Sequence, residues 1–235
     1  MTSSEAVAVT PPADDVSAET AIFESRIPPA LALVAFMALN IGLRFWLPKG
    51  GAIRVWWLVP AVEATLLLAL LAADPVSLAR RTKWLRRVAV TLTIVLVLAA
   101  LWATVLLVRD LIKGTGVSHS PTELLATGAL VWLGNNLSFA LLYWLVDGGG
   151  PLARTRHVTP IDFAFTQHMS PELAPPGWRP VFLDYLHLGF TNATAFSPTD
   201  VMPLTHRAKH LMMVQSTVAL ALFGLIVARA VNAFA

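Results

Sequence analysis

The stretch GFTNATAFSPTDVMPL, residues 189–204, lies directly before the last long apolar run of the chain. It is polar and contains two prolines, in a setting that is otherwise strongly apolar. Of the 235 residues, 56% are hydrophobic and only 13% are charged, and the mean hydropathy is +0.67. A typical soluble domain has about 25% charged residues. The stretch is therefore a polar interruption within a membrane protein.

Five apolar runs of the chain are long enough to cross a bilayer, because about 20 helical residues cover roughly 30 Å of hydrocarbon. They cover residues 29–47, 55–73, 88–112, 122–146 and 207–234. We therefore expect an all-α, polytopic membrane helix bundle with five spans. The chain has no cysteine, so disulfides and thiolate chemistry are excluded.

The predicted domain organisation has three parts. Residues 1–27 are acidic and rich in Ser, Thr, Ala and Pro, without the basic start and apolar core of a signal peptide, and we expect a disordered tail. Residues 28–121 hold the first three spans. Residues 122–235 hold the last two spans and, between them, the polar stretch.

The segment before and within the polar stretch predicts a re-entrant helix. Residues 180–194 are amphipathic and, as a helix, roughly 22 Å long, which is too short to span. Pro198 and Pro203 make residues 195–204 irregular, and Thr205 is the expected N-cap of the last span. Irregular backbone at membrane depth is tolerated only where protein or water covers it. The alternative is an interfacial helix that lies flat, although its charges are few.

A helix entering the membrane, a Thr-rich return with Asp200 and Pro203, and a long last helix together resemble the pore module of potassium channels. In this resemblance the fourth run is the outer helix, residues 180–193 are the pore helix and the fifth run is the inner helix. More of the chain resembles a family of uncharacterised bacterial predicted integral membrane proteins with this channel-like module. The shared features are five spans, a basic second loop, Gly-Gly after the fourth span and the Asp184-Tyr185-Leu186 helix. This likeness implies a fold and a multi-pass location in the bacterial inner membrane, but no activity.

The resemblance ends at the selectivity filter, which reads Thr-x-Gly-Tyr-Gly in potassium channels. The pore-like loop of this chain is Thr194, Ala195, Phe196, Ser197, Pro198, Thr199 and Asp200. The filter glycines supply backbone conformations that let carbonyl groups face the ion. Pro198 cannot adopt a positive φ, and serine rarely does. We therefore expect no potassium filter.

Two functions follow from these observations: a degenerate pore or transport module, or a structural or partner-binding membrane scaffold without conduction. The sequence has no Gly-rich phosphate loop, nucleophile elbow or zincin motif, so we expect neither an enzyme nor a cofactor. The expected partners are the lipid bilayer and further copies of the chain in a homo-oligomer. The net charge of +3 indicates topology rather than nucleic-acid binding.

The candidate functional residues are polar side chains inside the predicted spans, namely Asn40, Arg44, Glu63, Asn135, Asn136 and Gln215. Glu63 either takes part in proton or cation passage or forms a structural ion pair with Arg44, which we favour. The amides either join helices by hydrogen bonds, which we favour, or line a polar path. His206 and His210 share a helix face and, with Asp200 or His187, suggest a metal site. Solvated histidines are the simpler interpretation, and we predict no metal.

Charge bias predicts the topology. With the N-terminus in the cytoplasm, 11 of the 17 Lys and Arg residues lie on the cytoplasmic side, and the run 80–87 dominates that count. Five spans then put the C-terminus outside and the re-entrant segment on the cytoplasmic side, whereas a potassium-channel loop enters from outside. Reporter fusions should place residues 80–87 inside. Fusions that place this run outside would contradict the prediction and restore the channel orientation.

Overall fold

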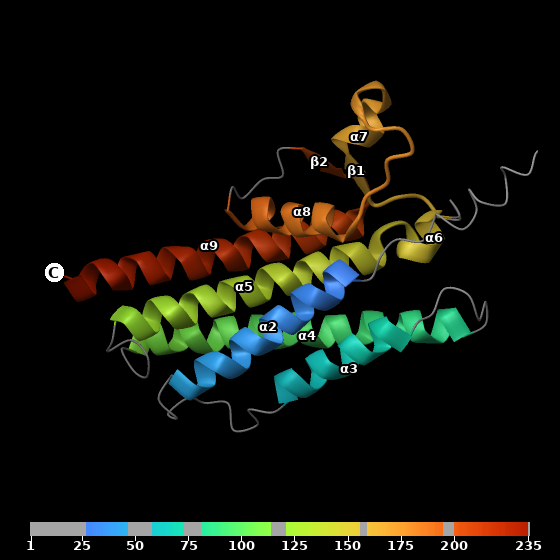
Figure 1. The fold of residues 1–235 in the computed structure, drawn as a ribbon. Helices are drawn as coiled ribbons and strands as arrows, with labels where there is room; N and C mark the ends of the chain where they lie inside the picture. Colours follow the sequence, from blue (N-terminus) through green and yellow to red (C-terminus); the bar gives the residue numbers. More distant parts are fainter. Residues whose placement is uncertain are drawn as a thin grey trace, which may run out of the picture.

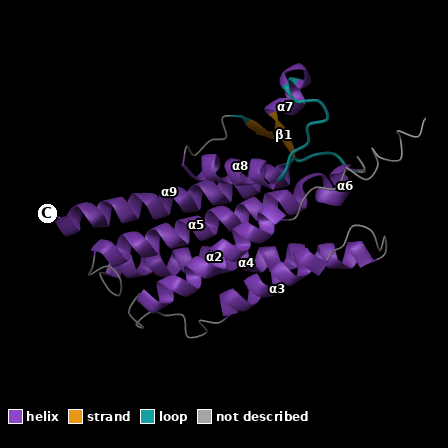
Figure 2. Ribbon diagram, in the orientation of Figure 1, coloured by secondary structure: helices purple, strands orange, loops and turns teal. Residues whose placement is uncertain are grey.

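The computed structural model describes residues 27–46, 58–72, 81–113, 121–155, 159–194 and 200–234. The described part is mostly helical, with one small antiparallel ladder (Figures 1 and 2). Its long helices are α2 (Ile27–Trp46), α3 (Leu58–Ala72), α4 (Arg81–Lys113), α5 (Pro121–Val146), α8 (Phe182–Thr194) and α9 (His206–Phe234). The predicted tail lies outside the described residues, except for Ile27, with which α2 begins.

Helix α5 forms the centre of the bundle. It packs against α4, α8, α9 and α2, and every residue from 134 to 145 is buried. In the apolar stretch of α5, 67% of the residues are buried, compared with 28% in α4 and 22% in α9. The outer helices therefore keep broad apolar faces such as a bilayer can cover.

Three of the described helices are long and apolar enough to cross a membrane, over residues Arg86–Lys113, Thr122–Gly149 and His206–Ala228. They correspond to the third, fourth and fifth predicted spans. Helix α3 has 15 described residues, and α2 contains a shorter apolar segment, Ile27–Ala38. The prediction of a helical membrane protein is thus supported in its coarse form, and the count of five spans is not confirmed.

The basic run before the third span is part of a helix. Helix α4 already begins at Arg81, although we expected a loop before Val88. The reason is local, since the run contains no Gly or Pro and its Leu, Lys and Arg residues favour helix. The basic end of α4 therefore extends the helix beyond its apolar stretch.

Three glycines turn the chain sharply at the end of α5. Gly148, Gly149 and Gly150 have φ values of 54°, 84° and 94°, a region that L side chains rarely adopt. Here α5 ends at Val146, as the sequence predicts, and a 3₁₀ turn (Asp147–Gly149) leads into the short helix α6 (Pro151–Thr155). This turn sends the chain back over the end of the bundle.

The connection between α5 and α9 contains short regular elements besides α8. Strand β1 (Phe163–Phe165) pairs with β2 (Val201–Pro203), with Ala164 opposite Met202, and the short helices α7 (Thr166–Met169) and η3 (Pro171–Leu173) follow β1. The expectation of irregular backbone throughout 195–204 is therefore wrong for β2, because three residues can extend when a distant strand offers a partner. Phe165 packs edge-to-face on Trp178 and Tyr185, which anchors the connection to α8.

Helix α8 lies along the first part of α9 and packs against α5 (Figure 1). Its 13 residues correspond to roughly 20 Å. Asp184 caps its start, because the carboxylate accepts the Val181 backbone N–H at 2.7 Å. The chain then returns through β2 to Thr205, whose hydroxyl accepts the Ala208 N–H at 3.3 Å as the N-cap of α9. Helices α8 and α9 thus begin at the same end of the bundle.

Candidate functional site

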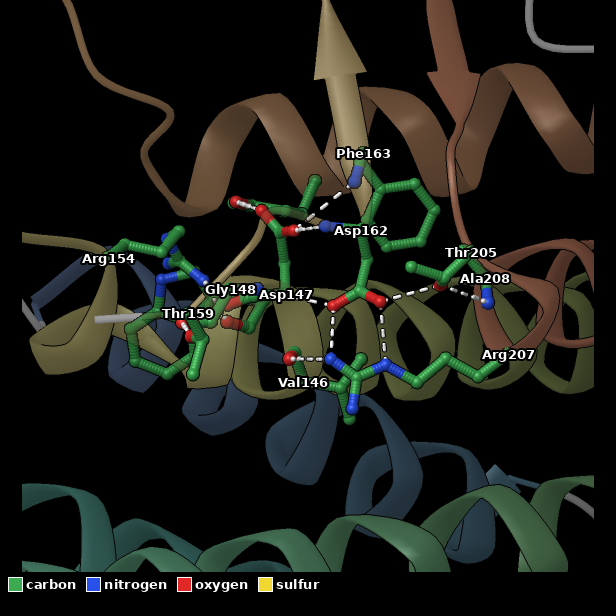
Figure 3. A network of polar contacts seen from close by, with 12 residues as sticks. Val146, Asp147, Gly148, Arg154, Thr159, Asp162, Phe163, Thr205, Arg207 and Ala208 are labelled. Carbon is green, nitrogen blue, oxygen red and sulfur yellow. Dashed lines mark hydrogen bonds and ion pairs between the residues drawn. The ribbon is translucent and has the colours of Figure 1, made fainter. Parts of the chain in front are cut away.

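Two polar clusters connect α5, α8 and α9, and both lie mostly inside the protein. The first, which we call the carboxylate joint, lies at the end of α5 and consists of Tyr185 together with Asp147, Arg154, Asp162 and Arg207, which are labelled in Figure 3. The second, which we call the amide lock, consists of Tyr143, Gly189, Asn192, Gln215 and Ser216 nearer the middle of the bundle. The sequence analysis identified one of these ten residues, Gln215, as a candidate.

In the carboxylate joint, Asp147 is fully buried, and its carboxylate accepts three hydrogen bonds. One carboxylate oxygen accepts the backbone N–H of Asp162 at 2.6 Å and that of Phe163 at 3.2 Å. The other accepts the hydroxyl of Tyr185 at 2.5 Å. Asp147 therefore fastens both the start of β1 and helix α8 to the end of α5.

Asp162 is the second buried carboxylate of the joint, and it binds the start of α9. Arg207 donates to both its oxygens, with Nε 2.6 Å from Oδ1, and the Thr205 hydroxyl donates to Oδ1 at 2.6 Å. The Gly148 N–H donates to Oδ2 at 3.2 Å. A two-pronged Arg–carboxylate contact is strong and directional. Asp162 therefore holds the glycine turn and the first turn of α9 together.

The pKa of Asp162 reflects this arrangement. Burial raises the pKa, but the hydrogen bonds from Arg207 and Thr205, the charge of Arg207 and the Gly148 amide together lower it below its ordinary value. The ionised form is thus the one that the fold stabilises.

Arg154 completes the joint from the side of α6. Its Nη1 donates to the backbone oxygens of Trp144 at 2.7 Å and Asp147 at 2.9 Å, which caps the carbonyl end of α5. Its guanidinium carbon lies 5.0 Å from the centre of the Tyr185 ring, within the range of a cation–π contact. Arg154 and Arg207 thus bring two positive charges to the two buried carboxylates, as buried charges require, while the Arg207 side chain stays 56% exposed.

The amide lock fixes α8 against α9 and α5. Gln215 Oε1 accepts the Tyr143 hydroxyl at 2.7 Å and the Asn192 amide at 2.8 Å, while Gln215 Nε2 donates to the Gly189 carbonyl at 3.0 Å. The Ser216 hydroxyl donates to Asn192 Oδ1 at 3.0 Å. A side chain at residue 189 would crowd α5, since a Cβ there would lie 3.3 Å from the Asn136 backbone oxygen. Glycine thus permits the close helix contact that these hydrogen bonds require.

The other predicted amides behave differently from one another. Asn135 donates from Nδ2 to the Thr104 hydroxyl on α4 at 2.9 Å, so it joins two helices, as Gln215 does. Asn136 is 4% exposed, and neither polar atom of its side chain has a hydrogen-bond partner in the described part of the chain. The helix-joining role that we expected for Asn136 therefore stays a prediction.

Of the two partners in the candidate ion pair, the structure describes the side chain of Glu63 alone. Glu63 lies on α3 and is fully buried. The side chains of Arg44 and Asn40 fall outside those that the structure describes. The pairing of Glu63 with Arg44 accordingly stays a prediction.

The pore-like loop is described at its two ends. Thr194 is the last residue of α8 and donates its hydroxyl to the Phe190 carbonyl, whereas residues 195–199 lie outside the described ranges. Asp200 pairs with His187 of α8, with Oδ2 and Nε2 3.2 Å apart. We expected Asp200 to accept hydrogen bonds from backbone amides of a non-helical return; most of that return lies outside the described residues, and the described partner of Asp200 is His187. Across the described ranges, no three His, Asp or Glu side chains are grouped to hold a metal ion.

The comparisons with known proteins add no relative. No family model, no curated protein and no solved structure matches this chain.

The carboxylate joint predicts how stability depends on pH. A carboxylate whose pKa is lowered by folding stabilises the fold above its unfolded pKa of about 3.9, and this stabilisation is lost as the pH falls through the folded value. We expect Asp162→Asn to lower the free energy of unfolding by about 2 kcal/mol near neutral pH, because Arg207 loses its charged partner. The variant should also lose part of the steep decline that the native protein shows below about pH 4.

Thermal unfolding in detergent micelles across this pH range measures both effects. The matched control is Glu172→Gln, which removes an exposed carboxylate in η3. Equal pH profiles for native protein and Asp162→Asn would show that the joint does not stabilise the fold.

Proposed function

We propose that this chain is a bacterial inner-membrane protein that crosses the bilayer five times and belongs to the bacterial channel-like membrane proteins it resembles. In this proposal α5, α8 and α9 form a degenerate pore or transport module, with α8 as a re-entrant helix. The module carries no potassium selectivity.

The observation that carries the proposal is the position of α8. It begins at the end of the bundle where α9 begins, and its roughly 20 Å cover only part of the bilayer core. The carboxylate joint holds both helix starts at that end, because Asp147 binds Tyr185 and Asp162 binds Arg207. A helix that enters, stops and returns is the arrangement that a pore module uses.

Asn136 favours a module that holds water or a polar solute between α5 and α8. It lies in the middle of α5 next to Gly189 of α8, in the part of the bundle where unpaired polar groups cost several kcal/mol in hydrocarbon. Water or a polar solute between α5 and α8 would satisfy this amide. A transport function gives such a residue a role.

The amide lock supports a second candidate, a membrane scaffold without conduction. Its polar groups at the centre of the module donate to and accept from one another rather than facing a path. A module closed in this way suits a structural or partner-binding role.

Ion flux from liposomes tests the proposal. Because Pro198 and Ser197 replace the filter glycines, we expect purified protein to give no barium-sensitive potassium flux. Flux without selectivity would support the pore module, and no flux for any ion would support the scaffold.

Valinomycin added at the end of each run is the control, since it shows that the vesicles held a potassium gradient. Selective, barium-sensitive potassium flux would contradict the argument from Ser197 and Pro198.

A further inference from the structure

We propose that the outer side of α8 carries a site for the headgroup of an ammonium lipid, of the phosphatidylethanolamine type. The site is a groove of about 560 Å³ between α8 and the segment formed by β1, α7 and Asp200. The inference rests on the proposed membrane position of α8, since that position turns the groove toward lipid.

The groove has one polar and one apolar group of lining residues. The polar residues are Thr166, Gln167, Asp184, His187 and Asp200, and the apolar ones are Phe165, Leu183, Leu186 and Phe190. Figure 1 shows α7 and β1 beside α8 on the side away from α5. A groove with both kinds of lining, open at the edge of a membrane bundle, fits a molecule with a polar head and apolar chains.

The charges of the groove select a cation. Asp184 and Asp200 bring two carboxylates, of which Asp200 is paired with His187, and none of the described lining residues is Lys or Arg. The side chains of His187 and Asp200 are 56% and 38% exposed, so both can be reached. A primary ammonium group offers three donors to these acceptors, and charge-assisted hydrogen bonds of this kind are strong.

The apolar lining holds the rest of the lipid. Leu183 and Phe190 are 64% and 51% exposed, so acyl chains can cover them, and the Phe190 ring also lies edge-on to Trp132 of α5. Phenylalanine rings beside the ammonium add a cation–π attraction. A headgroup with a net negative charge would instead face two like charges, without a compensating Lys or Arg among the described lining residues.

Native mass spectrometry of the protein in detergent micelles tests the site with three lipids of matched chains. We expect phosphatidylethanolamine to bind about tenfold more tightly than phosphatidylcholine, whose quaternary ammonium donates no hydrogen bond, and phosphatidylglycerol to bind weakest. Glycerophosphoethanolamine, which lacks the chains, should not compete at equal concentration. Equal affinity for the three lipids, or full competition by the chain-free headgroup, would overturn the lipid site.

Two variants locate the site. Asp184→Asn with Asp200→Asn should weaken phosphatidylethanolamine about tenfold while asparagine keeps the capping acceptor for the Val181 N–H. Thr166→Trp fills the groove without changing its charge and should weaken all three lipids. Glu172→Gln, outside the groove, should leave binding unchanged. Unchanged lipid binding in both groove variants would refute the site. This experiment measures binding and not ion flux, so its failure can be told apart from failure of the transport proposal.

Discussion

The ionised pair of Asp162 and Arg207 is the interaction on which the module depends. Asp162 is fully buried, and 45 residues of chain separate the two partners. Their contact closes the long connection between α5 and α9 into a loop with both ends at one end of the bundle. Asp147 adds Tyr185 to the same joint. The starts of α8 and α9 are therefore fixed beside the end of α5, and the 13-residue α8 ends partway along the longer α9.

Packing and polar contacts then determine how deeply α8 is held. Gly189 lets α8 approach α5. The Tyr143 hydroxyl and the Asn192 amide, which this approach buries, both donate hydrogen bonds to Gln215. Without such pairing, each group would be costly at membrane depth. Asn136 departs from this pattern, because its side-chain amide has no hydrogen-bond partner among the described residues, and the proposed pore module rests in part on this amide.

The sequence predicts those parts of the fold that depend on length and local chemistry. Helix α5 ends at Val146 because Asp147 and three glycines follow, and Thr205 caps α9 as expected. The joint was missed because Asp162 lies in a short connecting segment without helical periodicity and contacts Arg207, 45 residues later, only through the fold. The β1–β2 pairing was missed for the same reason, since each strand has three residues and its partner is remote. Gln215 and Asn135 were recognisable as polar residues in apolar helices, whereas the partners Tyr143 and Asn192 carried no such signal.

Membrane depth along α8 tests the central claim most directly. The chain has no native cysteine, so single cysteines at Val181, before α8, and at Thr194, its last residue, can each carry a fluorophore in the full-length protein. Quenching by lipids brominated at different depths then locates both positions. A re-entrant α8 predicts that residue 181 lies near the headgroups and residue 194 well inside the hydrocarbon, by up to roughly 20 Å. Equal, shallow depths for both would mean that α8 lies flat on the membrane and would contradict the account.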